Sequence, residues 1–147
     1  MGLVYADIEL ANADDLALVA RSILPTDQAR RATVRANVDS GAYMLCVNEE
    51  VESRLGLRYL ETQLARFADE SLHEVRVVGP IQVRFGNRQT HCNALVLPKD
   101  GEVLLGSIPM EDLDVVILPR EQRLAVNPAS PDMPSKPVKR HSLAVGR

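Results

Sequence analysis

The sequence is poor in aromatic residues and contains no tryptophan. Its 147 residues include two phenylalanines and three tyrosines. The net charge of −3 is unevenly distributed: residues 128–147 carry four basic side chains against one acidic side chain, which leaves residues 1–127 at −6. A surface that binds nucleic acid needs clustered basic residues, often with aromatic residues between them. We therefore expect no nucleic-acid partner.

Long hydrophobic runs are also missing, although 46% of the residues are hydrophobic. No segment approaches the ~20 apolar residues that a membrane-spanning helix requires. The first seven residues lack both the basic start and the apolar stretch of a secretory signal. We therefore expect a cytoplasmic protein that contacts no membrane.

Cysteine is scarce as well, since Cys46 and Cys92 are the only two. Because no export signal accompanies them, we expect two buried thiols rather than a disulfide. Cys46 lies between Leu45 and Val47, and we expect it to pack as a small apolar residue. The chain is long enough for one well-packed core and too short for two ordinary domains.

Short segments in which apolar and polar residues alternate recur along the chain, as in half-buried β-strands. They fall at residues 4–10, 34–38, 59–67, 72–78, 81–85, 90–97, 115–118 and 123–126. Gly86-Asn87 predicts a tight hairpin between two of them, and Gly79-Pro80 predicts a break between two others. We expect the last two segments to close the sheet.

Helices are expected to be few and short. The segment from Asn12 to Asp15 offers turn and N-cap chemistry ahead of an apolar stretch, and Asn48 and Gly56 are placed to begin and end another helical segment. In residues 109–113, Met110 and Leu113 should face inward. The pattern as a whole predicts one compact all-β domain with one or two short helices.

The domain is expected to span residues 1–127. From Pro128 onward the chain holds four of its nine prolines and little apolar content. This composition predicts a flexible, Pro-rich basic tail over residues 128–147.

The tripeptide Asp39-Ser40-Gly41, followed by Ala42, stands where a predicted strand ends. Asp-Ser-Gly is also a common turn sequence, so its context decides the interpretation. A strand leads into the tripeptide and a second apolar segment leads out of it. Further along, a predicted hairpin turns at Asp69, Glu70 and Ser71. Two leucines and a glycine then precede a predicted helix, at Leu104, Leu105 and Gly106.

These features, in this order, resemble the retropepsin-like (retroviral-type) aspartic peptidases. That family has an apolar-Asp-Thr/Ser-Gly catalytic loop, a hairpin flap, and a second motif of two apolar residues and a glycine before a helix. The resemblance spans roughly residues 3–127. It is close to the small stand-alone bacterial members, which share the Gly-Asn hairpin and the Ala-Leu-Val-Leu-Pro run of residues 94–98.

The resemblance implies a single-lobe acid-protease fold, a closed β-barrel, and an aspartic endopeptidase that uses no cofactor and no metal. It makes Asp39 the catalytic residue. It implies that the loop is supported by Ser40, Gly41 and Ala42 and rests on Leu104, Leu105 and Gly106. It also implies that a flap tip formed by Asp69, Glu70 and Ser71 covers a peptide or unfolded protein substrate.

Peptide hydrolysis by this chemistry needs two carboxylates. Facing carboxylates that share one proton can activate a water with the ionised member and protonate the carbonyl oxygen with the other. The chain holds a single Asp-Thr/Ser-Gly motif. A two-fold symmetric homodimer, with Asp39 of each protomer meeting on the axis, supplies the second carboxylate. The strands at residues 4–10 and 123–126 are candidates for the interface.

The neighbours of Asp39 have roles implied by the same resemblance. The hydroxyl of Ser40 should bond across the dimer axis to the opposite loop, and Gly41 permits the tight loop. Ala42 lacks the hydroxyl found at this position in pepsin-like lobes. Without that donor the charged form loses one favourable interaction, so we hypothesise activity that extends toward neutral pH.

The flap tip departs from the retroviral pattern, because it is acidic and has no glycine. A basic substrate near the tip is the corresponding expectation. The segment of residues 11–31 is also longer than in the viral pattern, which can alter the dimer edge.

Other interpretations of these residues stay open at this point. The same dimeric fold can serve as a non-catalytic peptide-binding or assembly module. A metal-dependent hydrolase would use His73 or His91, and a cysteine nucleophile would pair Cys46 with one of these histidines. Asp112 and Asp114 are interpreted as solvated helix-end and strand-end residues rather than a second acid pair.

Overall fold

The computed structural model describes residues 3–98 and 101–139. Expectations that fall on residues 1–2, 99–100 and 140–147, including the last part of the predicted tail, lie outside the described residues. The strands are β1 (Tyr5–Asn12), β2 (Arg31–Val38), β3 (Leu45–Val47), β4 (Arg58–Arg66), β5 (Leu72–Phe85), β6 (Arg88–Val96), β7 (Leu104–Leu105), β8 (Val115–Leu118) and β9 (Arg123–Val126). The helices are α1 (Ala13–Ala20), α2 (Glu49–Leu55) and α3 (Ser107–Leu113), with a 3-10 turn, η1, at Thr26–Gln28.

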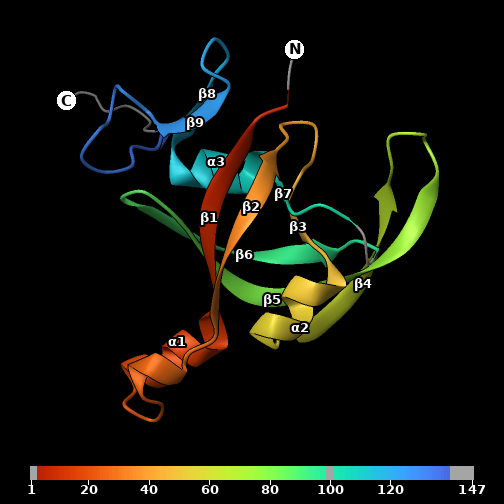
Figure 1. Ribbon diagram of the computed structural model, residues 1–147, viewed down its shortest axis with the longest axis vertical. Coiled ribbons are helices and arrows are strands. Elements are labelled where there is room, and N and C mark those ends of the chain that lie inside the picture. Colours follow the sequence, from red (N-terminus) through yellow and green to blue (C-terminus); the bar gives the residue numbers. More distant parts are fainter. Residues whose placement is uncertain (1–2, 99–100, 140–147) are drawn as a thin grey trace.

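Seven strands form one sheet in the order β1-β2-β7-β3-β6-β5-β4. An additional pairing of β1 with β5 closes the first six into a ring and leaves β4 on the outside (Figure 1). Inward-facing side chains fill the ring, and Leu10, Leu45, Ile81, Val83 and Leu105 are completely buried. The predicted all-β fold with a closed barrel is thereby confirmed. The described part of the chain holds three short α-helices at the three places where the sequence suggested helical segments, against one or two expected overall.

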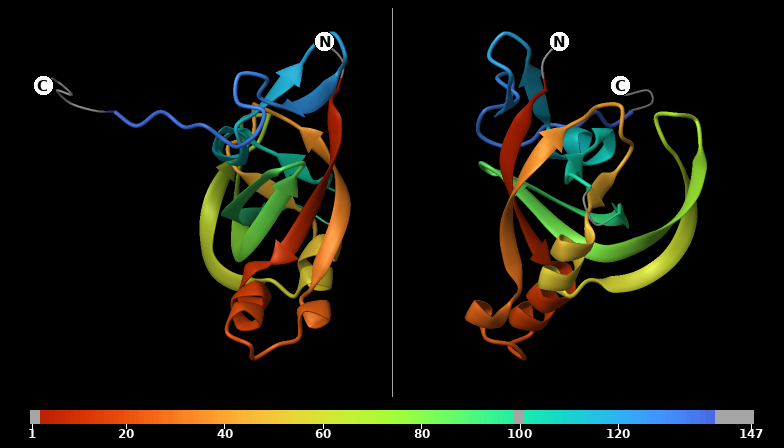
Figure 2. Two further views of the ribbon diagram at one scale, coloured as in Figure 1. Left: turned by 90° about the vertical axis from the view of Figure 1, so that its left-hand side faces the viewer. Right: turned by 45° about the vertical axis from the view of Figure 1, so that its right-hand side comes forward.

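The β4–β5 hairpin extends far beyond the barrel. Phe67 and Ser71 close its tip through a backbone hydrogen bond of 2.9 Å. In Figures 1 and 2 the hairpin curves upward until its tip lies at the same end of the molecule as the loop between β2 and β3. The predicted break at Gly79-Pro80 appears as a register shift between Val78 and Ile81 rather than as the end of a strand. β5 is therefore one strand of 14 residues, because β6 pairs with it on both sides of the shift.

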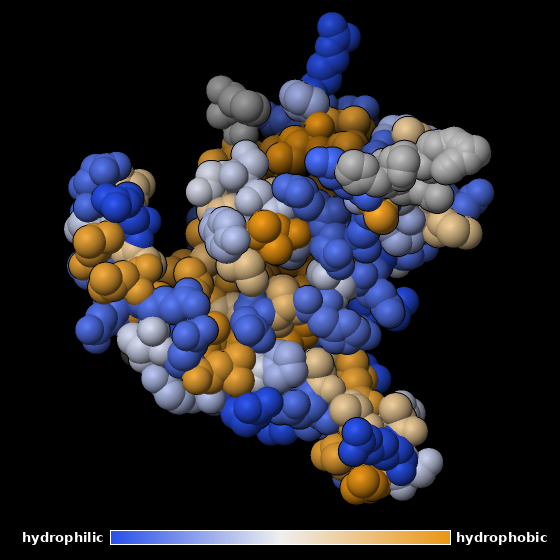
Figure 3. Space-filling view, turned by 180° about the vertical axis from the view of Figure 1, so that it is seen from behind, coloured by the Kyte–Doolittle hydropathy of each residue, from blue (hydrophilic) through white to orange (hydrophobic). Residues whose placement is uncertain are grey.

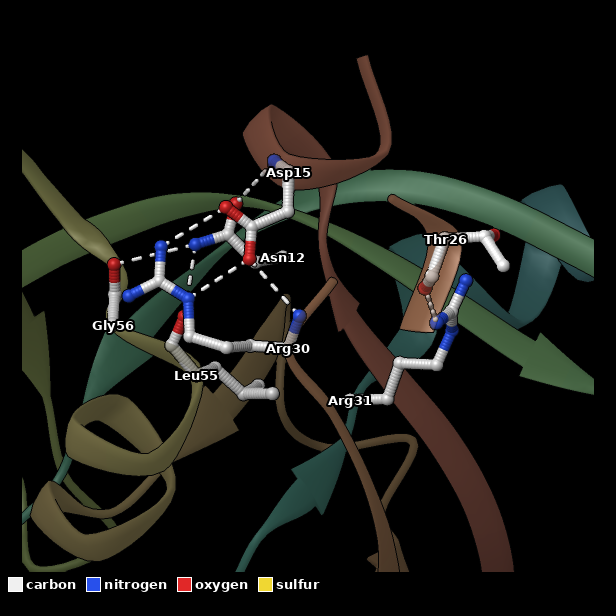
Figure 4. Close-up of polar contacts among 7 residues, drawn as sticks. All are labelled: Asn12, Asp15, Thr26, Arg30, Arg31, Leu55 and Gly56. Atoms are coloured by element: carbon white, nitrogen blue, oxygen red, sulfur yellow. Dashed lines mark hydrogen bonds and ion pairs between the residues drawn. The ribbon is translucent and has the colours of Figure 1, made fainter. Parts of the chain in front are cut away.

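Helix α1 is anchored to the barrel by a polar cluster in which Asn12 and Asp15 are buried and Arg30 is half-exposed (Figure 4). The side chain of Asn12 accepts a hydrogen bond from the Asp15 N–H, which confirms the predicted N-cap, and donates to the carbonyl oxygen of Leu55 at 2.8 Å. The guanidinium of Arg30 donates two hydrogen bonds to the carboxylate of Asp15 at 2.8 and 3.0 Å. These bonds lower the pKa of Asp15 and hold residues 13–30 as a projection at the end opposite the β2–β3 loop (Figure 1).

Helix α2 begins and ends where the sequence predicts. The side chain of Asn48 accepts a hydrogen bond from the Val51 N–H at 2.9 Å. Gly56 adopts the left-handed conformation (φ 59°), which ends the helix without steric strain. α2 thereby buries Val51 and Leu55 against the barrel.

The last two strands were expected to close the main sheet, and this prediction is wrong. β8 and β9 form a separate two-stranded sheet that packs Leu124, Val115 and Ile117 against the barrel core (Figure 1). The physical reason lies at Asp114, which ends α3 in a left-handed conformation (φ 55°) and turns the chain away from the barrel edge. Its carbonyl oxygen accepts a hydrogen bond from the Asn127 N–H, so both ends of the β8–β9 hairpin are tied at one point.

Residues 128–139, the described part of the segment after Asn127, have no regular secondary structure, but the first of them are bound to the body. The carboxylate of Asp114 accepts hydrogen bonds from the Ser130 hydroxyl at 2.5 Å and the Ser135 N–H at 2.8 Å. The carbonyl oxygen of Ser130 accepts a bond from Arg88, whose side chain is completely buried. The domain boundary at residue 127 stays a prediction, and residues 130–135 are in contact with the domain rather than separate from it.

The interpretation of Asp114 as a solvated residue is wrong. Its side chain is only 12% exposed and lies 3.7 Å from the guanidinium of Arg88. Hydrogen bonds from Ser130, Asn127 and the Ser135 N–H lower the pKa of Asp114 to about 2. Asp112 forms an ion pair with Lys136 at 3.2 Å, so the two carboxylates serve as attachment points for the C-terminal segment.

We predict a stability contribution from Asp114 that depends on pH. A carboxyl whose pKa is lower in the folded than in the unfolded state stabilises the protein above its ordinary pKa of about 4, and the effect disappears as the pH falls toward the folded value. The unfolding temperature of an Asp114→Asn variant should therefore lie below that of the unchanged protein at neutral pH. The difference should shrink between about pH 4 and the folded pKa of about 2.

Thermal unfolding followed by circular dichroism across that range measures this difference. The other carboxylates with lowered pKa, such as Asp15 and Asp69, are present in both proteins, so their acid dependence cancels in the comparison. A constant difference at all pH values would contradict the prediction.

Candidate active site

Asp39 directly follows β2, and a backbone hydrogen bond to β7 holds it in place. β2 and β7 pair in parallel, with Val38 opposite Leu105, and the N–H of Asp39 donates to the carbonyl oxygen of Leu105 at 3.0 Å. Leu105 is completely buried in the barrel. The two sequence motifs, 65 residues apart from Asp39 to Leu104 in the chain, are thus neighbours in the fold.

The loop after Asp39 turns its carboxylate outward and holds it there. The N–H of Gly41 donates to Oδ1 of Asp39 at 2.9 Å, and the N–H of Ala42 donates to the carbonyl oxygen of Asp39 at 3.1 Å. The side chain of Asp39 is half-buried, whereas Ser40 and Gly41 are exposed. The loop therefore presents an oriented carboxylate at the surface of the subunit.

Gly106 lies against the backbone of this loop. A Cβ atom at this position would stand 2.3 Å from the carbonyl oxygen of Met44 and 2.7 Å from that of Ala42. The first N–H groups of α3, those of Ser107 and Ile108, donate to the carbonyl oxygens of Ala42 and Tyr43 at 2.9 and 3.0 Å. Only glycine allows the start of α3 to approach the loop so closely.

A comparison with known protein families identifies the family to which this loop and its contacts belong. A family described as aspartyl protease matches residues 28–108, more than half of the chain. The chain belongs to this aspartyl protease family. The matched span contains the Asp39 loop, the projecting hairpin and Gly106. The search of curated proteins found no match.

The predicted flap tip of the aspartyl protease lies on the projecting hairpin. The hydroxyl of Ser71 donates to Oδ1 of Asp69 and is 2.8 Å from Nε2 of His73, and the ring of His73 meets that of Phe67 edge to face at 4.8 Å. The hydroxyl and the N–H of Ser71 lower the pKa of Asp69. Glu70 takes the positive φ (69°) that the turn requires. The turn is thus built from side-chain bonds instead of glycine, and in the described residues no hydrogen bond joins it to the Asp39 loop.

The two thiols are poor nucleophiles in this environment. Cys46 is buried beside the Asp39 loop, and burial together with the charge of Asp39 raises its pKa to about 11. Burial raises the pKa of Cys92 to about 12, and both cysteines are free. Because the thiolate is the reactive species, neither residue is prepared for nucleophilic attack at neutral pH.

The structure adds no support for the two alternatives that use histidine, a metal-dependent hydrolase and a Cys46–His nucleophile pair. His73 bonds to Ser71 at the hairpin tip, and His91 is exposed on β6. Over residues 3–98 and 101–139, no three side chains of His, Cys, Asp or Glu gather closely enough to hold a metal ion.

None of the described helices combines the length and apolar character needed to cross a membrane.

One feature of the surface was not predicted from the sequence. A groove of about 470 Å³ runs between the projecting hairpin and the body of the molecule. Its walls come from four parts of the chain: Glu49, Phe67, the segment of residues 73–76 and the segment of residues 96–98. No local pattern signals this groove, because it depends on how far the hairpin stands away from the barrel.

Proposed function

We propose that the protein is an aspartic endopeptidase that acts as a homodimer, with one Asp39 from each protomer forming the catalytic pair. The observation that carries the proposal is the outward-facing carboxylate of Asp39, oriented by the Gly41 N–H at 2.9 Å. The family match supports protease chemistry in general. The single Asp-Ser-Gly motif in the chain supports the requirement for a second copy.

The chemistry follows from bringing two such carboxylates together. Two negative charges a few ångströms apart cannot both persist, so the pair holds one proton between them. The ionised carboxylate takes a proton from a water molecule, which attacks the peptide carbonyl carbon. The protonated carboxylate gives its proton to the carbonyl oxygen, which yields a tetrahedral gem-diol. On its collapse, the carboxyl that took the water's proton gives that proton to the leaving nitrogen. The other carboxylate takes a proton from a gem-diol hydroxyl, so the amine and the acid leave and the pair again holds one proton.

The surface around the Asp39 loop is suited to a partner subunit. Tyr43 is 70% exposed and Ile108 is 38% exposed, and a backbone hydrogen bond joins these two residues. Among the described strands, β8 and β9 pair only with each other, so each has an edge that can accept another strand. The loop, the start of β1 and the β8–β9 hairpin all lie at one end of the molecule (Figures 1 and 2).

The main rival is a non-catalytic peptide-binding or assembly module with the same dimeric fold. A binding module has no chemical need for an oriented, solvent-facing carboxylate next to an axis of symmetry. The close contacts of Gly41 and Gly106 with the Asp39 loop therefore favour the enzyme.

A transition-state mimic tests the proposal directly. A peptide-like compound with a hydroxyl in place of the tetrahedral oxygen should raise the unfolding temperature and inhibit the cleavage of casein, because it binds only to an assembled carboxylate pair. Cleavage should persist toward neutral pH, because Ala42 offers no side-chain donor to favour the charged form of the pair. A casein-cleaving preparation that the compound neither stabilises nor inhibits would contradict the proposed mechanism.

A further inference from the structure

The groove beside the projecting hairpin is lined by both apolar and charged side chains. Apolar contacts come from Phe67, Val75, Val96, Leu97 and Pro98. Glu49, His73, Glu74 and Arg76 supply the polar groups. Figure 3 shows the hairpin as an arm that stands off from the body, with a hollow between the two.

One wall of the groove is an open strand edge. β5 pairs with β4 from Leu72 onward, but its pairing with β6 begins only at Val77. β6 leaves β5 at this point because the N–H of Leu97 donates to the carbonyl oxygen of Val47 at 2.7 Å. None of the described strands therefore pairs with residues 72–76 of β5 on the side that borders the groove. Such an edge can pair with an extended peptide through main-chain hydrogen bonds.

The charge of the groove is negative. The guanidinium of Arg76 is bound by both carboxylate oxygens of Glu52, so its charge is neutralised from outside the groove. Among the described residues, neither Glu49 nor Glu74 takes part in an ion pair. Two carboxylates are thus left to attract a positively charged ligand.

We propose that this groove binds an extended, lysine- or arginine-rich peptide as an added strand on β5, and that Glu49 and Glu74 select for its positive charge. The open strand edge requires an extended ligand, and the two carboxylates require a ligand with positive charge. The inference that the groove selects a substrate rests on the proposed function. The inference that the groove binds a basic peptide does not depend on catalysis.

Binding is tested with the full chain carrying Asp39→Asn, which prevents cleavage of the probe. The probe is a fluorescent hexapeptide of alternating lysine and valine, followed by fluorescence anisotropy. Glu49→Gln with Glu74→Gln should weaken binding roughly tenfold, because two partly exposed charge pairs are lost. The matched control, Glu9→Gln with Glu50→Gln, removes two exposed carboxylates that do not line the groove and should change little.

Matched peptides separate charge from strand pairing. Glutamate–valine and serine–valine peptides should bind more weakly than the lysine–valine probe, and so should a lysine–valine peptide with alternate backbone nitrogens methylated. Equal binding of any of these three would overturn the proposal. The proposal would also be overturned if the probe did not bind and the variant with Glu49→Gln and Glu74→Gln changed its oligomeric mass. In that case the edge of β5 would pair with a second copy of the chain.

The outcomes also separate this inference from the proposed function. If the probe binds with the expected charge preference but the unchanged protein cleaves neither casein nor the probe, the groove assignment stands and the peptidase assignment fails. If the protein cleaves casein but the probe shows no charge preference, the peptidase assignment stands and the groove assignment fails.

Discussion

Replacement of Asp39 by asparagine is expected to abolish peptide cleavage, with a loss of rate on the order of 10⁴-fold or more, as for other residues that take part directly in catalysis. An amide can neither take a proton from water nor share one with a facing carboxylate. The fold should be unaffected, because the Gly41 N–H that now donates to Oδ1 of Asp39 can donate to the amide oxygen of asparagine. Cleavage of casein and thermal unfolding, measured on the same preparations, check both parts of this expectation.

Subunit mixing extends the test to the shared site. Equimolar unchanged and Asp39→Asn chains, allowed to exchange, should retain about a quarter of the activity of the unchanged protein at the same total concentration, because only dimers with two aspartates are active. A protein in which each subunit carries its own complete site would retain about half under the same statistics. Activity that remains at half would therefore exclude the two-fold shared pair, and equal cleavage by the Asp39→Asn protein would exclude Asp39 from catalysis.

Replacement of Gly106 by alanine is expected to lower the cleavage rate roughly 100-fold, because displacement of a catalytic group by about 1 Å has effects of that size. The new methyl group would overlap the carbonyl oxygens of Met44 and Ala42, which stand 2.3 and 2.7 Å from its position. Both atoms belong to backbone, so either the loop or α3 must move. The variant should also lose about 1–3 kcal/mol of stability, as overpacked sites do.

Ser107→Ala is the matched control for this variant. It changes the neighbouring residue but keeps the backbone N–H that donates to the carbonyl oxygen of Ala42 at 2.9 Å. Its rate should stay close to that of the unchanged protein. Affinity for the transition-state mimic distinguishes the two explanations for a slow Gly106→Ala variant: a displaced carboxylate pair binds the mimic weakly, whereas an intact pair binds it normally. Full activity of Gly106→Ala would show that the contact between α3 and the loop does not position Asp39.

Local chemistry made much of the fold predictable. The caps at Asn12 and Asn48 and the left-handed Gly56 are determined by residues within one helical turn, and the structure confirms all three. Gly86-Asn87 likewise forms the turn of the predicted hairpin between β5 and β6. The alternation of apolar and polar residues located the strands, because it reflects burial on one side of each strand.

Features that depend on residues far apart in sequence were missed or misplaced. The β8–β9 hairpin was assigned to the main sheet, because nothing local shows that Asp114 adopts a left-handed conformation and binds Asn127 and Ser130. The attachment of residues 130–135 escaped notice because proline-rich composition predicts mobility, whereas the buried Arg88 and Asp114 supply binding partners from other elements.

The amino-acid sequence by itself determined the family and the strand-rich architecture, and it singled out Asp39 as the acidic residue proposed for catalysis, because each is written in a short pattern of neighbouring residues. Only the tertiary structure decided what surrounds that residue. The approach of Gly106 to the Asp39 loop, the open edge of β5 and the groove it borders arise from the way distant strands pair around a closed ring. Such pairing is determined by burial across the whole barrel and not by any single segment.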